Sequence, residues 1–215
     1  MKAVVAVILG LVAGFLIDLT APQAAPAAAG TQGRRSGGKG AMSHSPIALV
    51  RIGTVPSSQV EALVSAVASA FDRDVFVAGS VDLPPQAFDP ERRQYLSTVI
   101  LEVLTSMRRP GWERVLGIAD VDLFASRLNF VFGEADAGSG VAVMSLARLH
   151  DRDTTVFHRR AETEAIHELG HTYGLGHCRD PRCVMWFSNT LAESDLKGTR
   201  FCEAHARELA NARQP

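Results

Sequence analysis

The most informative scarcity in this 215-residue sequence is that of cysteine: there are three, all after residue 177. A disulfide scaffold spreads an even number of cysteines through the chain, so an odd and clustered set argues against one. Because residues 1–177 contain no cysteine, no upstream segment can block a metal site by donating a thiolate to it. Clustered beside histidines, the three cysteines are better explained as metal ligands.

Charge of one sign and long apolar runs are also scarce. The 22 Lys and Arg residues are balanced by 23 Asp and Glu residues, which leaves no basic excess to neutralise phosphates and argues against a nucleic-acid partner. The apolar run from Ala3 to Ile17 is too short for a comfortable membrane span and has the length of a signal-peptide core. Any membrane contact is therefore expected only through residues 3–17, and only if they are retained.

The first 45 residues differ in composition from the rest. Residues 30–45 are rich in Gly, Ser and basic side chains without apolar periodicity, and we expect a disordered linker there. Two explanations of the segment before them stay open: residues 1–29 are a signal that exports or tethers the protein, or the true start is Met42. Residues 46–213 have the composition of one globular domain. A cytoplasmic location is favoured for this domain unless the signal is real, and a monomer is expected.

From Ile47 onward, predicted strands alternate with predicted helices, which indicates an α/β layer with one sheet. Apolar runs predict strands at 47–52, 75–81, 128–132 and 141–146, and the stretch 115–124 is expected to carry a further strand into a loop. Amphipathic patterns predict helices at 56–71, 89–107, 154–173 and 202–212. Four acidic residues are assigned to solvated loops, because the chain has no twelve-residue calcium loop: Asp120, Asp122, Glu134 and Asp136.

The stretch HELGHTYGLGHC, residues 167–178, carries the strongest chemical signal. His167 and His171 are four residues apart, so on a helix they project from one face and can hold a single metal ion. Gly174 permits a positive φ, which would end the helix and bring His177 round as a third ligand. Three imidazoles and one open position are typical of a catalytic zinc. HExxH alone is weak evidence, but HExxHxxGxxH with every fixed position present is strong.

Glu168 would stand beside the metal, where a general base can take a proton from the attacking water. Zinc held by three neutral imidazoles lowers the pKa of its water from about 15.7 towards 7. The pattern therefore predicts hydrolysis of an amide, with Glu168 passing the proton to the leaving amine. Tyrosine is rare, with only Tyr95 and Tyr173, and the second lies on the zinc helix itself. Stabilisation of the oxyanion is therefore assigned to the zinc alone.

The motif and the residues after Cys178, together with stretches nearer the start, resemble the archaemetzincin family of zinc metallopeptidases. The resemblance extends over roughly residues 47–210 and rests on HELGHTYGLGHC, CVM, FC, IALVRIG, LGIADVDLF, LNFVFGEA, VAVMSLARL and VMWFSNTL. It implies a compact single-domain, metzincin-like α/β fold with a mixed, mostly parallel sheet and an antiparallel edge strand above the cleft. An active-site helix and a C-terminal helix complete that fold. Residues 141–147 are expected to be the edge strand that pairs with extended substrate, the alternative being a plain core strand.

The resemblance also implies roles for the residues of the motif. His167, His171 and His177 match the family's catalytic zinc ligands and Glu168 its general base. Met185 matches the methionine of the turn beneath the zinc, where its thioether would fill an apolar floor.

A second, structural zinc is implied on Cys178, Cys183 and Cys202. The family ends in a CxxC pair, whereas here the fourth position is His205. Cys₃His is still a normal zinc set, and Cys202 and His205 are three apart, on one helix face. Two zinc ions per chain are therefore expected. The rival is a Cys178–Cys183 disulfide with Cys202 free, which an exporting signal would favour.

The leading hypothesis is a zinc-dependent endopeptidase or aminopeptidase acting on peptide or protein substrates. A zinc-stabilised peptide-binding module with little or no hydrolytic activity is the alternative. The intact Glu168 argues against that alternative, because binding alone needs no general base. A zinc hydrolase of a non-peptide amide also fits the motif.

Overall fold

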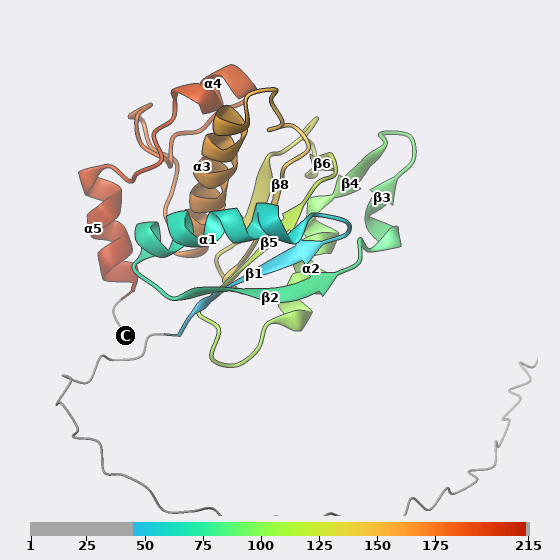
Figure 1. Cartoon of the computed structure of the whole chain (residues 1–215), viewed down its shortest axis with the longest axis horizontal. Coiled ribbons are helices and arrows are strands. Elements are labelled where there is room, and N and C mark those ends of the chain that lie inside the picture. Colours follow the sequence, from blue (N-terminus) through green and yellow to red (C-terminus); the bar gives the residue numbers. More distant parts are fainter. Residues whose placement is uncertain (1–44, 214–215) are drawn as a thin grey trace, which may run out of the picture. The chain divides into compact units, whose positions relative to one another are not determined.

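A five-stranded sheet lies at the centre of the computed structural model, which describes residues 45–213 (Figure 1). In spatial order its strands are β2 (Val75–Val81), β1 (Ile47–Ile52), β5 (Arg114–Ala119), β8 (Val141–Ser145) and β7 (Gly133–Asp136). The first four are parallel, and β7 runs antiparallel to β8. The prediction of a mixed, mostly parallel sheet with an antiparallel edge strand is confirmed.

Helices cover both faces of this sheet. α1 (Ser57–Phe71) and α3 (Thr154–Thr172) pack on one face, and α2 (Ser97–Met107) packs on the other (Figure 1). Along β1, Ile47 and Leu49 join the core beneath α1 and α3, while Ala48 and Val50 join the core beneath α2. Strands buried on both faces are apolar at nearly every position, which is why they were found as continuous apolar runs.

The predicted helix over residues 89–107 is wrong in its first half. β3 (Phe88–Asp89) and β4 (Gln94–Leu96) form a hairpin there, and α2 starts only at Ser97. The Asp89 carboxylate accepts hydrogen bonds from the backbone N–H groups of Glu91 and Arg92, at 2.9 and 3.0 Å. Arg93 then adopts a φ of 55°. A turn closed by a side-chain carboxylate and a left-handed residue cannot continue a helix.

The small sheet that contains this hairpin also includes β6 (Leu123–Phe124), which pairs in parallel with β4. A single 3₁₀ turn, η1 (Pro85–Ala87), leads into the hairpin. β3, β4 and β6 thus form a second, three-stranded sheet. It lies beyond the C-terminal end of β5, because β6 follows β5 after only residues 120–122.

Two predictions about strands near the sheet edge are wrong. The strand lies at Gly133–Asp136, not at residues 128–132, because these four residues pair with β8. Residues 141–147 are not the edge: β8 lies between β5 and β7, and all five of its residues are buried. The edge strand is therefore β7, although its residues Glu134 and Asp136 were assigned to solvated loops from the sequence.

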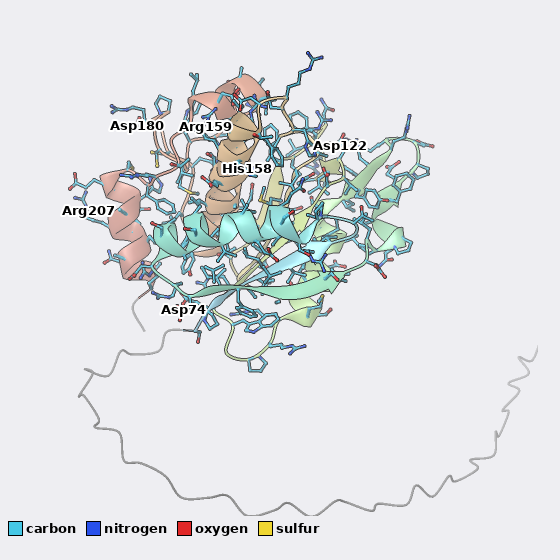
Figure 2. All side chains as sticks on the ribbon, viewed as in Figure 1. Asp74, Asp122, His158, Arg159, Asp180 and Arg207 are labelled. Carbon is cyan, nitrogen blue, oxygen red and sulfur yellow. The ribbon has the colours of Figure 1, made fainter. Side chains whose placement is uncertain are left out.

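The C-terminal part adds α4 (Leu191–Leu196), which was not predicted, and α5 (Glu203–Ala212), which was. Arg159, on α3, is labelled near α4 in Figure 2 and donates to the backbone and carboxylate oxygens of Asp195. Among residues 45–213, no helix combines the length and apolarity needed to cross a bilayer. The predictions for residues 1–44 lie outside the described residues.

Candidate active site

α3 carries the first part of the site, and both of its ends are defined by sequence. Asp153 caps its start by accepting from the backbone N–H of Thr155 at 2.8 Å. At its end Gly174 has a φ of 82°. The N–H of Leu175 bonds to the carbonyl of Gly170, and that of Gly174 to the carbonyl of His171. These two bonds form a Schellman termination, as the positive φ at Gly174 predicted.

Three histidines meet just beyond this helix end. The Nε2 atoms of His167 and His171 are 3.1 Å apart, and the available ligand atoms of His167, His171 and His177 lie within 4.8 Å of one another. His167 Nδ1 donates to the carbonyl of Val184, and His171 Nδ1 to that of Leu175, both at 2.8 Å. Because Nδ1 carries the proton in both rings, Nε2 keeps its lone pair for a metal ion.

The pKa values of the three imidazole rings are lowered, which favours their neutral form. Burial lowers the pKa of His167 well below its usual range, and the positive charge of Lys197 adds to that effect. Burial also lowers the pKa of His171 and of His177. Neutral imidazoles at neutral pH are the form that binds zinc, and an all-imidazole set with distances of this kind fits a zinc ion.

Glu168 lies beside the histidines and beneath β7. A Cβ built on Gly133 would fall 2.5 Å from Cγ of Glu168 and 2.6 Å from the carbonyl oxygen of Val143. The strand therefore rests directly on the carboxylate side chain, an approach that only glycine allows. Burial raises the pKa of the Glu168 carboxyl well above its usual range, and the neighbouring Glu164 carboxylate raises it further. A carboxylate with a raised pKa accepts a proton more readily than a free one, which suits a general base.

Met185 lies directly under this part of α3. Its side chain is fully buried, and a Cβ on Gly170 would fall 2.5 Å from its sulfur. The backbone around it is tied to the site, because the Cys178 N–H bonds to the carbonyl of Met185 at 2.8 Å. The thioether therefore packs against α3 at a distance that only a glycine at position 170 allows.

A cleft of about 530 Å³ opens over the histidines. It is bounded by α3, by the segment leading into β7 and by the segment after Met185. The lining includes Leu128, Phe130, Gly133, Glu134, Glu164, His167, Glu168, His171, His177, Phe187, Asn189 and Lys197. Tyr173 is absent from this lining: its hydroxyl donates to Glu113 at 2.8 Å, and its ring stacks on Phe71. It is a core residue that does not line the cleft.

Several residues of the cleft were missed by the sequence analysis. Glu134 is not in a solvated loop; it lies on β7, lines the cleft and accepts from the hydroxyls of Ser97 and Thr98. Glu164 stands one helical turn before Glu168, so helical periodicity could have placed it on the same face. Lys197 is the one lysine after residue 39 in a chain otherwise rich in arginine. A single lysine among arginines was a feature of the sequence that could have marked Lys197 as a candidate site residue.

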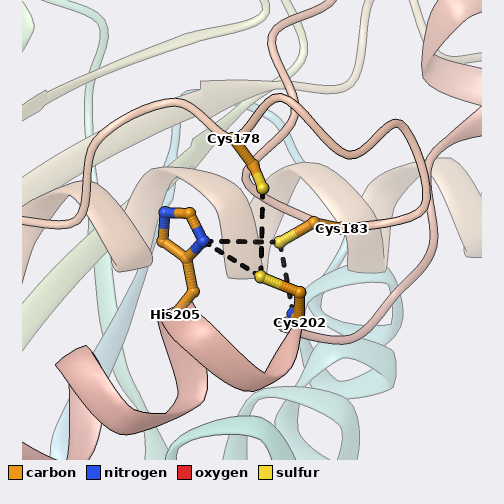
Figure 3. A group of neighbouring side chains, drawn as sticks. All are labelled: Cys178, Cys183, Cys202 and His205. Atoms are coloured by element: carbon orange, nitrogen blue, oxygen red, sulfur yellow. Dashed lines mark hydrogen bonds between the residues drawn. The ribbon is translucent and has the colours of Figure 1, made fainter.

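The second predicted site is also brought together (Figure 3). Sγ of Cys178 and Sγ of Cys202 are 3.9 Å apart, and His205 Nδ1 is 3.3 Å from Cys202 Sγ and 3.8 Å from Cys183 Sγ. Thiolates bound to one tetrahedral zinc are separated by about 3.8 Å, since each Zn–S bond is about 2.3 Å. No pair of the three cysteines is joined as a disulfide in the structure. The donor set and its spacing fit a zinc ion.

The environment of the cysteines favours thiolate at one position. The backbone N–H of His205, at the start of α5, lowers the pKa of Cys202 to about 6. Burial instead raises the pKa of the Cys183 thiol to about 11, and a bound cation would have to displace that proton. His205 donates from Nε2 to the carbonyl of Gly176 at 3.1 Å. Its Nδ1 is thereby left facing the sulfurs.

Comparison with known proteins gives a consistent result. A family model, described as Peptidase family M54, matches residues 71–211. An archaemetzincin of Pyrococcus abyssi is 38% identical over 175 residues, which cover 76% of this chain and 93% of that protein. An archaemetzincin of Archaeoglobus fulgidus is 38% identical over 156 residues, covering 73% of this chain and 94% of that protein.

Solved structures agree with the sequence relatives. The crystal structure of archaemetzincin from Methanopyrus kandleri superposes with a TM-score of 0.74 at 40% identity, covering 80% of this chain and 96% of that one. The archaemetzincin of Archaeoglobus fulgidus, solved in complex with malonate, gives a TM-score of 0.68 at 36% identity, covering 75% and 99%.

Proposed function

This chain belongs to peptidase family M54, that of the archaemetzincins, and is a zinc metallopeptidase; we propose that it cleaves peptide bonds with Glu168 as general base. We assign His167, His171 and His177 as the ligands of the catalytic zinc. One observation supports this more than any other: three imidazole nitrogens converge beside a buried carboxylate in a cleft. The proposed catalytic domain is residues 46–213.

The chain's own residues account for the proton transfers. Zinc at this site would supply Lewis-acid chemistry, polarising the scissile carbonyl and making water nucleophilic at neutral pH. Glu168 takes a proton from the attacking water and gives it to the leaving nitrogen. Gly133 holds β7 against Glu168 and so limits the positions that the carboxylate can adopt. The carbonyls of Val184 and Leu175 orient two of the imidazoles.

The open edge of β7 is the proposed path for the substrate backbone. β7 is the last strand of the sheet, so its outer N–H and C=O groups can pair with an extended peptide. It borders the same cleft as Glu168, and Leu128 and Phe187 at the cleft are about half exposed. Those apolar side chains offer contacts to a peptide held along the strand.

A second zinc is proposed on Cys178, Cys183, Cys202 and His205, giving two ions per chain. Its role would be structural, because four protein ligands leave no open position. Cys178 directly follows His177, so a closed site here would also fix the third imidazole of the catalytic centre.

The test of the proposed mechanism is Glu168→Ala. We expect the variant to keep its metal and lose about 10²–10⁴-fold in turnover of peptides, the usual contribution of a general base. Glu162→Ala is a matched control, because Glu162 lies on the same helix but outside the cleft lining. Zinc content is measured on each variant by elemental analysis, and turnover on a peptide library with and without a chelator.

The outcomes separate the alternatives. Unchanged hydrolysis by zinc-loaded Glu168→Ala would contradict the role of Glu168. Loss of the catalytic zinc would make Glu168 a ligand or a structural partner instead. Chelator-sensitive binding of peptides by the wild type without any cleavage would favour the peptide-binding module.

A further inference from the structure

A buried ion pair lies in the cleft next to the proposed catalytic centre and takes no part in the mechanism above. Lys197 Nζ is 3.2 Å from Oε1 of Glu164, and the two side chains are 1% and 2% exposed. Both residues line the same cleft as His167 and Glu168. An ion pair taken out of water is costly unless it is well bonded, so its place beside the reacting groups calls for a functional explanation.

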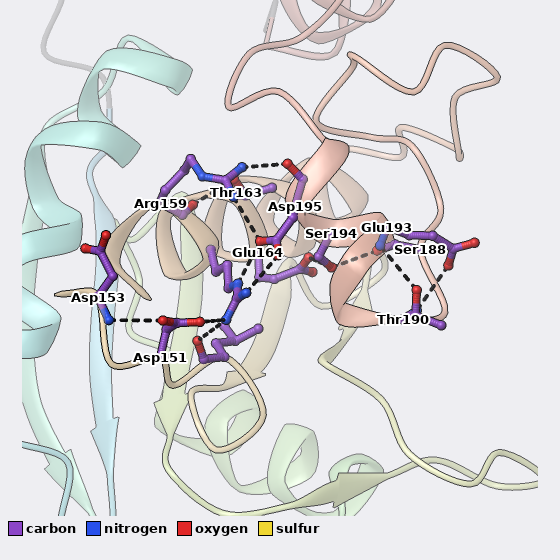
Figure 4. A network of polar contacts seen from close by, with 12 residues as sticks. Asp151, Asp153, Arg159, Thr163, Glu164, Ser188, Thr190, Glu193, Ser194 and Asp195 are labelled. Atoms are coloured by element: carbon purple, nitrogen blue, oxygen red, sulfur yellow. Dashed lines mark hydrogen bonds and ion pairs between the residues drawn. The ribbon is translucent and has the colours of Figure 1, made fainter. Parts of the chain in front are cut away.

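α4 adjoins the pair, and Figure 4 labels its Ser194 and Asp195 together with Glu164 of α3. Thr190 and Glu193 form a capping box at its start. The Asp195 carboxylate accepts from Arg159 at 2.9 Å and from Arg160 at 2.7 and 2.8 Å, which fastens α4 to α3. Lys197 is the first residue after this helix. The position of the Lys197 ammonium group is therefore fixed by the packing of α4 on α3.

Glu164 is bonded from the α4 side as well. Its Oε1 accepts from Ser194 Oγ at 3.2 Å in addition to Lys197. An ammonium group has three donors, and the described contacts of Lys197 Nζ include one hydrogen bond, to Glu164. Donor capacity on Lys197 and acceptor capacity on Glu164 thus remain for a ligand that enters the cleft.

The position of the pair along α3 identifies which part of a substrate would reach it. His171 stands one turn after His167 on α3, and Glu164 one turn before Glu168. If Glu168 hands its proton to the leaving nitrogen, that nitrogen lies on the Glu168 side of the centre. The side chain of the residue that carries the nitrogen would then extend towards Glu164 and Lys197. This step rests on the proposed function.

We propose that Glu164 and Lys197 determine specificity by selecting a carboxamide side chain, that of Gln or Asn, on the residue whose nitrogen leaves. The pair presents a donor beside an acceptor, and a carboxamide presents an acceptor beside a donor. A carboxylate side chain would face Glu164 and a basic one would face Lys197, each at close range and away from water. An aliphatic side chain would exclude water from the pair without bonding to it.

Other charges at the cleft do not change this selection. The Glu134 carboxylate is bonded by Ser97 and Thr98, and Glu168 is engaged in the reaction. Both are acidic, so they act further against a carboxylate side chain. Lys197 is the basic side chain that contacts Glu164 among the described ion pairs.

The test measures binding separately from turnover. Zinc-loaded Glu168→Ala is titrated by calorimetry with four blocked peptides that differ only after the scissile bond, carrying Gln, Glu, Lys or Leu. We expect Gln to bind at least about tenfold more tightly than each of the others, because a site built for hydrogen bonds rejects side chains that cannot make them. A preference for Leu, Glu or Lys, or no measurable binding of any peptide, would overturn the proposal.

Substitutions then assign the preference to the pair. In the Glu168→Ala background, Glu164→Leu with Lys197→Met replaces the ion pair by apolar side chains, a change that proteins often tolerate. Ser194 retains a hydrogen bond to Ser188 at 3.0 Å. This variant should lose the preference for Gln and bind Leu more tightly. Glu164→Gln alone should shift preference towards Glu, because Lys197 stays without its counter-charge.

Asp151→Asn is the matched control, because Asp151 contacts Arg160 but does not line the cleft. It should leave the preference unchanged. An unaltered preference for Gln in the double substitution would overturn the assignment to Glu164 and Lys197. Wild-type turnover of a peptide library, measured in parallel, judges the proposed peptidase mechanism independently.

Discussion

Gly133 shows how one residue without a side chain can set the geometry of a reacting group. Its backbone contacts the Glu168 side chain so closely that an added Cβ would lie 2.5 Å from Cγ and 2.6 Å from Cδ. The carbonyl oxygen of Val143 on β8 would lie 2.6 Å from the same Cβ, so the added methyl group could not be accommodated on that side either. The proposed base and the edge strand are therefore positioned by the same contact.

Gly133→Ala is expected to reduce kcat/KM by about 10²-fold, the usual consequence of displacing a reacting group by about 1 Å. The metal content should stay that of the wild type, since no proposed ligand is touched. Gly138→Ala, in the turn of the same hairpin, is the control: its nearest neighbour is the Asp136 carboxylate at 3.3 Å, away from Glu168. Full activity of Gly133→Ala in steady-state assays would contradict the positioning role.

His205 is the residue at which this chain departs from the family pattern. We expect purified protein to carry two zinc ions, and His205→Ala to release one and lower the melting temperature. His205→Cys should keep both ions, because Cys₄ and Cys₃His are both normal zinc sets. His150→Ala, at an exposed histidine, should change neither quantity. One zinc in the wild type together with a Cys178–Cys183 disulfide in a peptide map would contradict the second site.

Spacing along the chain was enough to foresee how the motif histidines converge. Helical periodicity puts His167 and His171 on one face, and the glycine at position 174 indicates the turn that returns His177. The contacts of Gly133 and Lys197 could not be foreseen in this way. They depend on the packing of β7 and α4 against α3. Neither element has a sequence pattern that predicts this packing.

Among elements, those that bury a periodic apolar face were predicted well. α1 and α3 have an amphipathic pattern and β1, β2 and β8 are apolar runs, and each was placed within a few residues. β7 was missed because GEAD has little apolar character and becomes a strand through its pairing with β8. The start of α2 was missed because local hydrogen bonds of Asp89 compete with a helix.

α4 depends on Asp195 for its attachment to α3. Asp195→Asn removes the carboxylate paired with Arg159 and one of the two paired with Arg160, which is only 6% exposed. Charge-assisted hydrogen bonds contribute about 1.5–3 kcal/mol each, so we expect the free energy of unfolding to fall by a few kcal/mol. The KM for peptides should rise, because α4 precedes Lys197. Denaturant titration and steady-state kinetics measure the two effects.

Glu203→Gln is the control for that experiment, since Glu203 pairs with Arg207 on the exposed surface of α5 and surface pairs contribute little. A variant Asp195→Asn that is as stable as the wild type would show that α4 is held by its capping box and apolar contacts alone.

At the scale of the whole molecule, the two proposed metal sites share one segment of chain. Val184 accepts from His167, and Gly176 accepts from His205. Cys178 is adjacent to His177 and bonds to Met185 through its backbone. The same backbone segment therefore bonds to side chains of both proposed sites. The helix that carries His167 and His171 packs on the sheet, and His177 adjoins Cys178 of the cysteine cluster.

The buried imidazoles make the stability of the metal-free protein depend on pH. Burial lowers the pKa values of His167, His171 and His177 below the ordinary value of 6.5. Above pH 6.5 both the folded and the unfolded chain hold these rings neutral. Below it, the unfolded chain binds protons that the folded chain does not, so the free energy of unfolding falls as the pH falls. Each histidine that stays neutral contributes up to about 1.4 kcal/mol per pH unit.

Glu168 affects the pH dependence of stability in the opposite direction. Its pKa is raised, so the folded chain takes up a proton before the unfolded chain does, and this stabilises the folded state as the pH falls. The measurement is therefore made with chelator-treated Glu168→Gln, between pH 7 and pH 5. Asp122 and Asp195, whose pKa values are lowered from 3.8, affect stability only at still lower pH.

In that background the free energy of unfolding should decrease steadily from pH 6.5 to pH 5. Adding His167→Gln should flatten the decrease, because the most deeply buried of the three rings no longer resists protonation. His158→Gln, on the exposed side of α3 (Figure 2), should leave the slope unchanged. A slope that His167→Gln does not alter would mean that the unoccupied histidine cluster accepts protons as readily as an unfolded chain does, and that its imidazoles are not held neutral for a metal ion.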